Sequence, residues 1–384
     1  MTIPYGRQDI REEDIAAVIR VLQSDFLTQG PVVPAFEEAV AKKVGAGYAV
    51  AANSATSALH IACLALGLGP GDSLWTSPIT FVASANCALY CGAAVDFVDI
   101  DPRTYNMCPL ALAEKLKKSA NEGRLPKVIV PVHLTGQPCD MEAISKLASE
   151  YGVRIIEDAS HAIGGAYKNL PIGSCRYSDI TIFSFHPVKI ITTAEGGMAL
   201  TNDRHLAERM DLLRSHGITR DPKKMSQVPD GPWYYQQIDL GFNYRLTELQ
   251  AALGLSQLER LEKYVTARQQ QAAVYNSALN SLPLRTPFQH PDSYSAFHLY
   301  VIQLEDKERH KAVFESLRKA EIGVNLHYIP VHLQPWYKSM GFRSGDYPAS
   351  EDYYSRAISL PIFPELQESQ QTLVIHSLGE AISQ

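Results

Sequence analysis

Short apolar runs alternate with helical patterns from residue 46 onward, and this alternation constrains the fold more than any other feature. The successive pairs are GYAVAANS and SALHIACLALGL, SLWTSP and FVASANCALYCG, then AVDFVDI and LALAEKLKKSA. A strand–helix–strand order of this kind builds a mainly parallel sheet with helices on its faces. The order continues to VRIIEDAS, after which two closely spaced strands, DITIFSFH and GGMALTND, share one connection. We therefore predict an α/β fold with a large, mainly parallel sheet.

The second half of the chain has a different pattern. An amphipathic stretch from Leu246 to Leu279 is longer than most globular helices, so we expect it to cross a domain boundary. Beyond it come the strand HLYVIQL, the helix HKAVFESLRKAEIG, the strand VNLHYI, a proline-rich connection and the closing helix LQESQQTLVIHSLGEAI. We predict a large domain over residues 1–250, including the N-terminal segment, and a smaller C-terminal α+β domain over residues 251–384.

The glycine-rich segment GLGPGD, residues 67–72, raises the question of a nucleotide-binding loop. It follows a helix and precedes a strand, which is the reverse of the order that a phosphate-binding loop needs. We interpret it as a helix C-cap and turn. A nicotinamide-dependent dehydrogenase is also disfavoured, because no G-x-G-x-x-G lies between a strand and a helix.

Composition excludes several kinds of partner. The net charge of −6 and the pI near 6.1 provide no general attraction to nucleic acid or anionic lipid. No stretch reaches the roughly 18 apolar residues of a membrane span, and the N-terminal residues are not those of a signal peptide. The six cysteines lack C-x-x-C pairs and suit reduced, mostly buried thiols: Cys63, Cys87, Cys91, Cys108, Cys139 and Cys175. We expect a cytoplasmic protein without bound metal.

Three segments carry candidate chemistry. In SFHPVKIITTAEGG, Lys189 follows a strand that should be buried; it is either a surface lysine or a Schiff-base nucleophile whose pKa burial lowers. In IIEDASHA, Asp158 closes a strand at the sheet edge where ligands bind, and is either a helix N-cap or a partner for a cofactor nitrogen. In NSATSALH, Ser54, Thr56 and Ser57 either cap a helix or bind a phosphate at its N-terminus.

With these segments in this order, the chain resembles the DegT/DnrJ/EryC1/StrS family of sugar aminotransferases. The shared segments span essentially the whole chain: LTQGP, NSATSALH, PITFVASANC, EDASHAIGG, FHPVKIITTAEGG, RSHG, GFNYRLTELQAALG and VHLQPWY. The resemblance implies the fold-type I architecture of transferases that depend on pyridoxal 5'-phosphate (PLP). It also implies a homodimer with shared active sites.

The resemblance assigns roles around the cofactor. Lys189 is expected to hold PLP as a Schiff base and to carry the proton between the cofactor and the sugar carbon. Asp158 is expected to pair with the pyridine nitrogen, and His161 to approach the ring hydroxyl. Phe81 is expected to cover one ring face, the alternative being a core aromatic residue. The implied phosphate ligands are Thr56, Ser57 and Ser184 of one subunit and Asn243 of the partner subunit.

The resemblance also implies contacts with the substrate. They are Tyr5, Phe26, Leu27, Thr28, Ala55, Ser184, Asn243, Asn325, Leu326, His327 and Tyr328. His327 is expected to hydrogen-bond the sugar or pyrophosphate, with Arg214 or Arg220 adding positive charge nearby. A zinc site at His327 and His332 is disfavoured, because neither cysteine nor carboxylate accompanies them.

Within the family, the runs HPVKIITTAEGGMALTND, DGPWYYQQIDLGFNYR and VNLHYIPVHLQPWY look most like enzymes of pseudaminic acid biosynthesis. The implied reaction moves an amino group from L-glutamate to C4 of a UDP-linked 4-keto-6-deoxy-N-acetylhexosamine, in two half-reactions. Three alternatives stay open. They are another nucleotide keto-sugar (dTDP-linked or 3-keto), a deoxysugar dehydratase, which Lys189 argues against, and a non-catalytic PLP-binding homologue.

Overall fold

The computed structural model describes residues 2–383. Its centre is a seven-stranded sheet with the strand order β1-β9-β8-β5-β4-β2-β3. The strands are β1 (Tyr48–Ala52), β2 (Ser73–Thr76), β3 (Ala94–Phe97), β4 (Val128–Val130), β5 (Arg154–Asp158), β8 (Ile180–Ser184) and β9 (Gly197–Thr201). β9 is antiparallel to both its neighbours, and the remaining neighbours pair in parallel. The predicted α/β fold with a mainly parallel sheet is confirmed.

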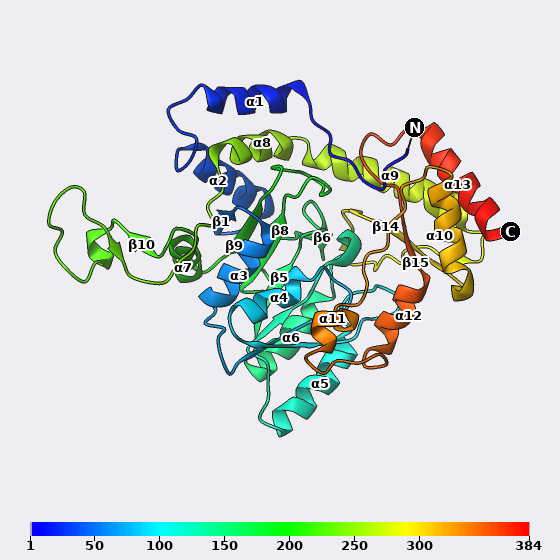
Figure 1. Cartoon of the computed structure of the whole chain (residues 1–384), viewed down its shortest axis with the longest axis horizontal. Coiled ribbons are helices and arrows are strands. Elements are labelled where there is room, and N and C mark those ends of the chain that lie inside the picture. Colours follow the sequence, from blue (N-terminus) through cyan, green and yellow to red (C-terminus); the bar gives the residue numbers. More distant parts are fainter. Residues whose placement is uncertain (1, 384) are drawn as a thin grey trace.

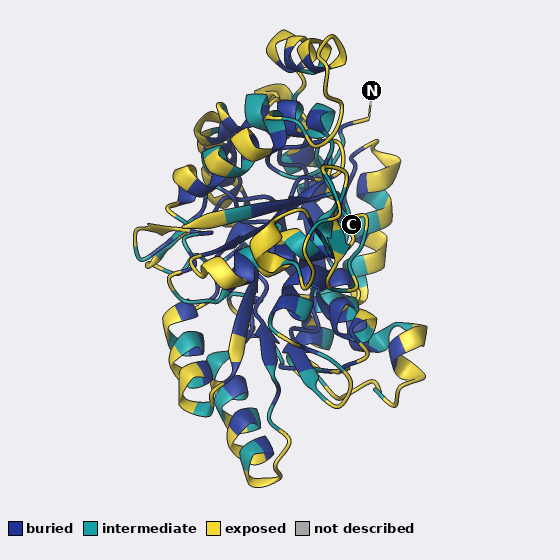
Figure 2. Ribbon diagram, turned by 90° about the vertical axis from the view of Figure 1, so that its left-hand side faces the viewer, coloured by how far each residue is buried: buried dark blue, intermediate teal, exposed yellow. Residues whose placement is uncertain are grey.

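Helices cover both faces of this sheet (Figure 1). One face packs on α2 (Val32–Val44), α5 (Pro109–Asn121), α6 (Met141–Tyr151) and α8 (Glu248–Leu258). The other face packs on α3 (Ala55–Ala65), α4 (Ala83–Tyr90) and α7 (Arg204–Arg214). Side chains alternate along each strand, so that in β8 Phe183 enters the first core and Ile182 the second. Figure 2 shows the strands buried between exposed outer helix faces.

A second unit follows in the C-terminal part of the chain. Its sheet has the order β12 (Leu284–Arg285), β14 (Tyr300–Leu304) and β15 (Ala357–Leu360), and it packs on α10 (His310–Lys319) and α13 (Glu368–Ser383). α9 (Leu261–Leu279) joins the two units: Tyr264 lies in a core of the large sheet, and Tyr275 lies in the C-terminal core. The N-terminal Ile3 also packs into the C-terminal core. The exact boundary near residue 250 stays a prediction.

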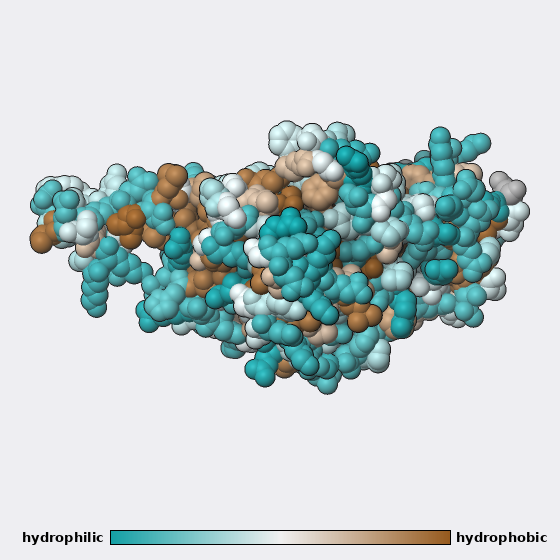
Figure 3. All heavy atoms as spheres, turned by 90° about the horizontal axis from the view of Figure 1, so that it is seen from below, coloured by the Kyte–Doolittle hydropathy of each residue, from teal (hydrophilic) through white to brown (hydrophobic). Residues whose placement is uncertain are grey.

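The remaining elements are short. β6 (Ala166–Tyr167), β7 (Leu170–Pro171) and β13 (Ser293–Tyr294) form a small sheet, and α11 (Pro335–Lys338) and α12 (Pro348–Arg356) fill the proline-rich connection. β10 (Ile218–Thr219) and β11 (Gln236–Gln237) pair at the base of an arm over residues 218–240, which projects from the body in Figure 1. Figure 3 shows apolar side chains on this projecting end, and the exposed ones are Val228, Trp233, Tyr235, Ile238 and Leu240.

The long helix expected over residues 246–279 is broken at Glu259 and Arg260, between α8 and α9. Asp14 of α1 (Glu12–Leu22), a fully buried carboxylate, lies against this break. It accepts hydrogen bonds from Ser256 Oγ at 2.6 Å and Gln257 Nε2 at 2.8 Å, and Arg260 lies 2.6 Å away. A charge buried at this depth requires such partners, and the last turn of α8 together with Arg260 at the break supplies them. The single-helix prediction is therefore wrong.

Two other local predictions have different outcomes. The segment GLGPGD is a helix end and turn, with Gly67 at φ +75°, which confirms that interpretation. The segment VNLHYI is not a strand, because only Asn325 pairs with another strand, through a bridge to Ser359. Its residues Asn325 to Tyr328 line a pocket instead. Among residues 2–383, no helix is both long and apolar enough to cross a bilayer.

Candidate active site

A pocket of about 540 Å³ opens where the parallel strands end, between the N-termini of α3 and α4 and the segment 325–328. This is the edge at which open α/β sheets bind ligands. It brings together twelve of the predicted site residues: Tyr5, Ala55, Thr56, Phe81, Asp158, His161, Ser184, Lys189, Asn325, Leu326, His327 and Tyr328. Segments separated by more than 300 residues therefore meet in one cavity.

Lys189 lies on the loop between β8 and β9 and faces this pocket. Burial lowers its pKa to about 8, although the negative charge of Asp158 acts in the opposite direction. About a tenth of Lys189 is therefore a neutral amine near pH 7, whereas an ordinary lysine is almost entirely charged. The environment of Lys189 is that of a nucleophile rather than that of a surface lysine.

We expect the rate at which the cofactor-free protein takes up PLP to follow this pKa. The rate should rise with pH, because the neutral amine is the nucleophile, and should level off above the Lys189 pKa of about 8. Stopped-flow absorbance between about pH 6 and about pH 10 measures this dependence. A rate that continues to rise through the whole range would show that Lys189 titrates as an exposed lysine does.

Asp158 ends β5 with both carboxylate oxygens hydrogen-bonded. Oδ1 accepts from the Ser160 backbone N–H at 3.1 Å and from Ser160 Oγ at 2.6 Å, and Oδ2 accepts from Ser84 Oγ at 2.6 Å. Turns, not a helix, follow β5, so Asp158 is not a helix N-cap. The adjacent Glu157 bonds to His133 Nε2 at 2.7 Å and does not line the pocket. Asp158 is thus the carboxylate that this strand presents to a ligand.

The start of α3 combines a side-chain cap with free backbone N–H groups. Ser54 is the N-cap and accepts from the Ser57 backbone N–H at 3.1 Å, while Ser57 Oγ donates to Asn53 Oδ1 at 2.7 Å. Ser57 therefore stands behind the pocket, whereas Ser54 and Thr56 line it. A Cβ on Gly197 would fall 2.4 Å from the Ala55 nitrogen, so glycine is needed for β9 to pass this close. The free N–H groups of the first turn suit a phosphate.

His161 has a defined tautomer. The Thr135 backbone N–H donates to its Nδ1 at 3.3 Å, so the ring hydrogen lies on Nε2, which is 3.2 Å from the Tyr328 hydroxyl. Burial, together with the positive charge of Lys189, lowers the pKa of His161 well below its usual range. His161 therefore presents a neutral N–H donor to the pocket.

His298 is a pocket residue that the sequence interpretation missed. Its ring lies 4.4 Å from that of His161, its Nδ1 is buried without a hydrogen-bond partner among the described residues, and burial lowers its pKa. It stands just before β14, in the segment HLYVIQL that was predicted as a strand, so no local signal marked it as a pocket residue. Phe81, by contrast, is 59% exposed at the pocket, which argues against the alternative of a core aromatic residue.

The part of the pocket that is predicted to bind the substrate is uncharged. Asn325 Nδ2 lies 3.3 Å from His327 Nε2, and His327 Nδ1 lies 2.8 Å from Ser359 Oγ. Burial and the charge of Lys189 lower the pKa of His327 to about 3, so this histidine is uncharged. His332 bonds to Glu351 at 2.9 Å and lies outside the lining.

Some of the predicted site residues do not line this pocket within a single chain. Phe26, Leu27, Thr28 and Asn243 are exposed and lie outside its lining. Arg214 is engaged by Glu37, Asp211 and the carbonyl oxygen of Ala51, so the expectation that it adds charge at the substrate is wrong. The i,i+3 spacing of Asp211 and Arg214 is visible in the sequence, whereas the contacts with Glu37 and Ala51 are not.

Arg220, the other predicted cation, lies on the projecting arm, over the Tyr235 ring at 5.7 Å. It is also outside the pocket lining.

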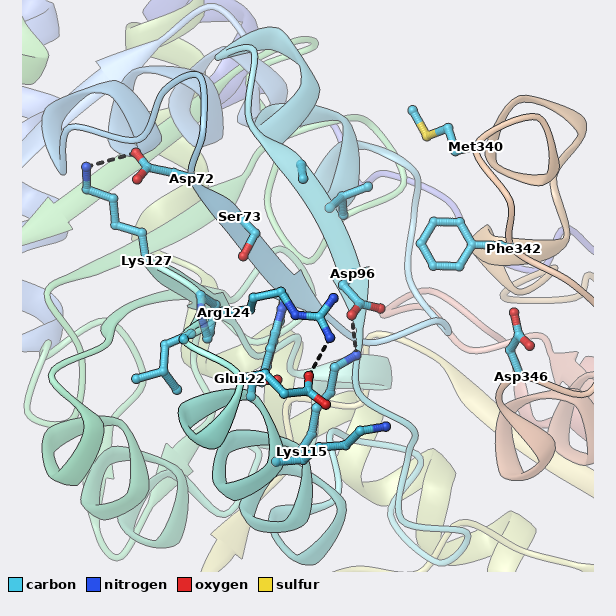
Figure 4. Close-up of a pocket in the computed structure, with 18 of the residues that line it drawn as sticks. Asp72, Ser73, Asp96, Lys115, Glu122, Arg124, Lys127, Met340, Phe342 and Asp346 are labelled. Atoms are coloured by element: carbon cyan, nitrogen blue, oxygen red, sulfur yellow. Dashed lines mark hydrogen bonds and ion pairs between the residues drawn. The ribbon is translucent and has the colours of Figure 1, made fainter.

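A larger hollow of about 1140 Å³ lies beside the edge strand β3 (Figure 4). Its cations are mostly neutralised within the hollow: Lys115 pairs with Asp96 at 2.7 Å, Lys127 with Asp72 at 2.9 Å, and Arg124 with Glu122. It contains none of the predicted catalytic groups. The smaller pocket is therefore the candidate active site.

The chain has extensive likeness to known proteins. A model of the DegT/DnrJ/EryC1/StrS aminotransferase family matches residues 8–379. The chain is 39% identical over 386 residues to spore coat polysaccharide biosynthesis protein SpsC of Bacillus subtilis (strain 168), covering 99% of this chain and 97% of that one. A structure of Helicobacter pylori PseC, described as an aminotransferase involved in the biosynthesis of pseudoaminic acid, has a TM-score of 0.91 and 33% identity over 100% of both chains.

A putative sugar aminotransferase of Streptococcus pneumoniae, Spr1654, is similar as well. Its PMP-form has a TM-score of 0.91 and 28% identity over 99% of each chain. Its PLP-form has a TM-score of 0.90, with 28% identity over 100% of this chain and 99% of that one. The amine, the bonded carboxylate and the free helix N-terminus of the present pocket fit that cofactor.

Proposed function

Because the chain belongs to the DegT/DnrJ/EryC1/StrS aminotransferase family, whose members depend on PLP, we propose a specific reaction for this sugar aminotransferase. It moves the amino group of L-glutamate to C4 of a UDP-linked 4-keto-6-deoxy-N-acetylhexosamine. The product is a UDP-4-amino-4,6-dideoxy sugar, and the enzyme would be a UDP-4-amino-4,6-dideoxy-N-acetyl-β-L-altrosamine transaminase. The full-length likeness to PseC is the observation that carries this choice of acceptor.

Each of the pocket residues has its own role in the proposed reaction. Bound PLP supplies a carbonyl group for the amine and a ring that withdraws electrons. Lys189 holds the cofactor and, as a neutral amine, accepts and returns the proton at the reacting carbon. Asp158 keeps the ring nitrogen protonated, and Thr56 and Ser184 bind the phosphate. His161 donates its Nε2–H toward the ring hydroxyl.

The sugar end suits an uncharged ligand. His327 and Asn325 are neutral hydrogen-bonding groups held by Ser359 and by each other. They match the hydroxyl and amide groups of an N-acetylhexosamine. Among the described lining residues there is no arginine, so the pyrophosphate would need a cation from elsewhere.

A homodimer with shared active sites would complete the pocket. Asn243 and the segment 26–28 are exposed on one chain and remain proposed contacts of the partner's site. A further apolar surface lies on the outer face of α1, where Ile15, Ile19 and Leu22 are 44%, 45% and 58% exposed. Exposed apolar patches of this kind mark interaction surfaces. The projecting arm offers a second such patch.

A cytoplasmic location is part of the proposal. The six cysteines are free, and five of them are buried. Free thiols persist in a reducing compartment, where disulfides are rare.

The acceptor is tested with a panel of sugars. The purified enzyme is supplied with PLP, L-glutamate and, in parallel, UDP- and dTDP-linked sugars with the ketone at C4 or C3. We expect turnover of the UDP-linked 4-keto-6-deoxy-N-acetylhexosamine alone, with the product's C4 configuration determined by NMR. Turnover restricted to dTDP-linked or 3-keto sugars would overturn the acceptor and leave the family assignment intact.

A further inference from the structure

Two hydroxyl groups stand behind Asp158 and reach it in series. Ser84 Oγ donates to Asp158 Oδ2 at 2.6 Å, and Thr80 Oγ1 lies 2.7 Å from Ser84 Oγ. We propose that Thr80 and Ser84 are positioning residues that hold the Asp158 carboxylate by hydrogen bonds and aim it at the ring nitrogen of the cofactor. This inference rests on the proposed function only through PLP and Asp158, and does not depend on the sugar.

The direction of these two hydrogen bonds follows from the number of hydrogen atoms that each group can donate. A hydroxyl carries one hydrogen, and an ionised carboxylate only accepts. Ser84 therefore directs its hydrogen to Asp158, and Thr80 must direct its own hydrogen to Ser84. Each bond in such a chain polarises the next, so the Thr80 hydrogen bond strengthens the one that Asp158 receives. The two hydroxyl groups therefore form a relay in which both hydrogen bonds are directed toward one oxygen of the Asp158 carboxylate.

The relay is shielded from solvent. Ser84 is 0% exposed and Thr80 2%, and both line the pocket at the side where α4 begins. Water replaces a lost donor less readily there than on the surface, so the loss of either hydrogen bond has a larger energetic cost. Ser84 also lies in the first turn of α4, where the helix dipole favours a negative charge.

The relay has a chemical consequence for the proton on the ring nitrogen. Hydrogen bonds to a carboxylate favour its charged form. With Ser84 and Ser160 donating, the proton stays on the nitrogen and the charge stays on Asp158. When the Ser84 donor is removed, the carboxylate holds a proton more readily, and the shared proton moves toward Asp158. The ring then withdraws electrons less strongly.

Four variants test the relay. Ser84→Ala removes the donor, and Thr80→Val removes the relay hydroxyl while keeping the side-chain shape. Thr80→Ser keeps the hydroxyl and serves as the rescue. Ser77→Ala is the matched control, because Ser77 is 1% exposed and its Oγ has no hydrogen-bond partner among the described residues.

The readouts are two properties of the loaded enzyme other than activity. The first is the ¹⁵N NMR shift of PLP labelled at the ring nitrogen, which reports its protonation directly. The second is the dissociation constant of PLP, measured by equilibrium dialysis. We expect Ser84→Ala to move the ¹⁵N shift toward the unprotonated position and to weaken PLP binding about tenfold, and Thr80→Val to do both less strongly. Thr80→Ser and Ser77→Ala should match the wild type.

The outcomes separate the inference from its premise. Wild-type shifts in Ser84→Ala and Thr80→Val would overturn the relay, and so would equal changes in Ser77→Ala. If Ser84→Ala does not fold, the comparison of Thr80→Val with Thr80→Ser is sufficient to test the relay. A wild-type protein that fails to bind PLP would instead contradict the proposed function.

Discussion

Replacing Lys189 with arginine is expected to reduce turnover by at least about 10⁴-fold, because one amine serves as nucleophile and as proton carrier. Arginine keeps the positive charge but cannot become a neutral amine in a protein. The variant should still fold, since the Lys189 side chain borders a cavity rather than filling a core. Product formation is measured by NMR with L-glutamate and the keto-sugar, and folding by circular dichroism.

Lys115→Arg is the matched control for this variant. Burial also lowers the pKa of Lys115, but this lysine pairs with Asp96 of the edge strand β3 in the larger hollow and does not line the pocket (Figure 4). It should retain wild-type turnover. Full activity in Lys189→Arg would refute the assignment of the lysine.

The same variant also tests the shared site. Lys189→Arg and Asn243→Ala proteins, each impaired alone, are mixed and allowed to exchange subunits. If Asn243 serves the partner's pocket, half of the sites in each mixed dimer are intact, and about a quarter of wild-type activity should return. No recovery after verified exchange would place Asn243 in its own chain's site or outside any site.

Asp158→Asn is expected to lower kcat by about 10²–10³-fold, because a preorganised charge at the reacting group is lost. The asparagine keeps the size of the side chain but cannot hold a proton on the ring nitrogen. It also removes the negative charge that raises the Lys189 pKa, so PLP uptake should reach its plateau below about pH 8. Single-turnover kinetics with L-glutamate and the stopped-flow pH series measure the two effects.

Glu157→Gln is the comparison for Asp158→Asn. Glu157 is the neighbouring buried carboxylate of β5, and it bonds to His133 away from the pocket. Its substitution should lower the unfolding temperature without changing the cofactor or its kinetics. Equal kinetic losses in the two variants would mean that Asp158 acts only by stabilising the strand.

Local pattern in the sequence was sufficient for the sheet and for the two central residues. Strand and helix periodicities depend on neighbouring residues, so they predicted the parallel strands whose ends meet at the pocket. Lys189 follows a buried strand and Asp158 ends one, and both placements are visible without a structure. The helix start at α3 was predicted for the same reason, and phosphate binding there stays a prediction.

Only the tertiary structure decided how distant segments meet. Several contacts join segments that have no common sequence pattern. They are the hydrogen bond from Thr135 that sets the His161 tautomer, the approach of His298 to His161, and the hydrogen bond from Ser84 to Asp158. The pairing of Glu37 with Arg214 and the contact of Asp14 at the break between α8 and α9 also join distant segments. The sequence determined which groups were available, because residue type and local period depend on near neighbours. The structure determined which of them act together, because hydrogen bonds and burial depend on distances that only the folded chain establishes.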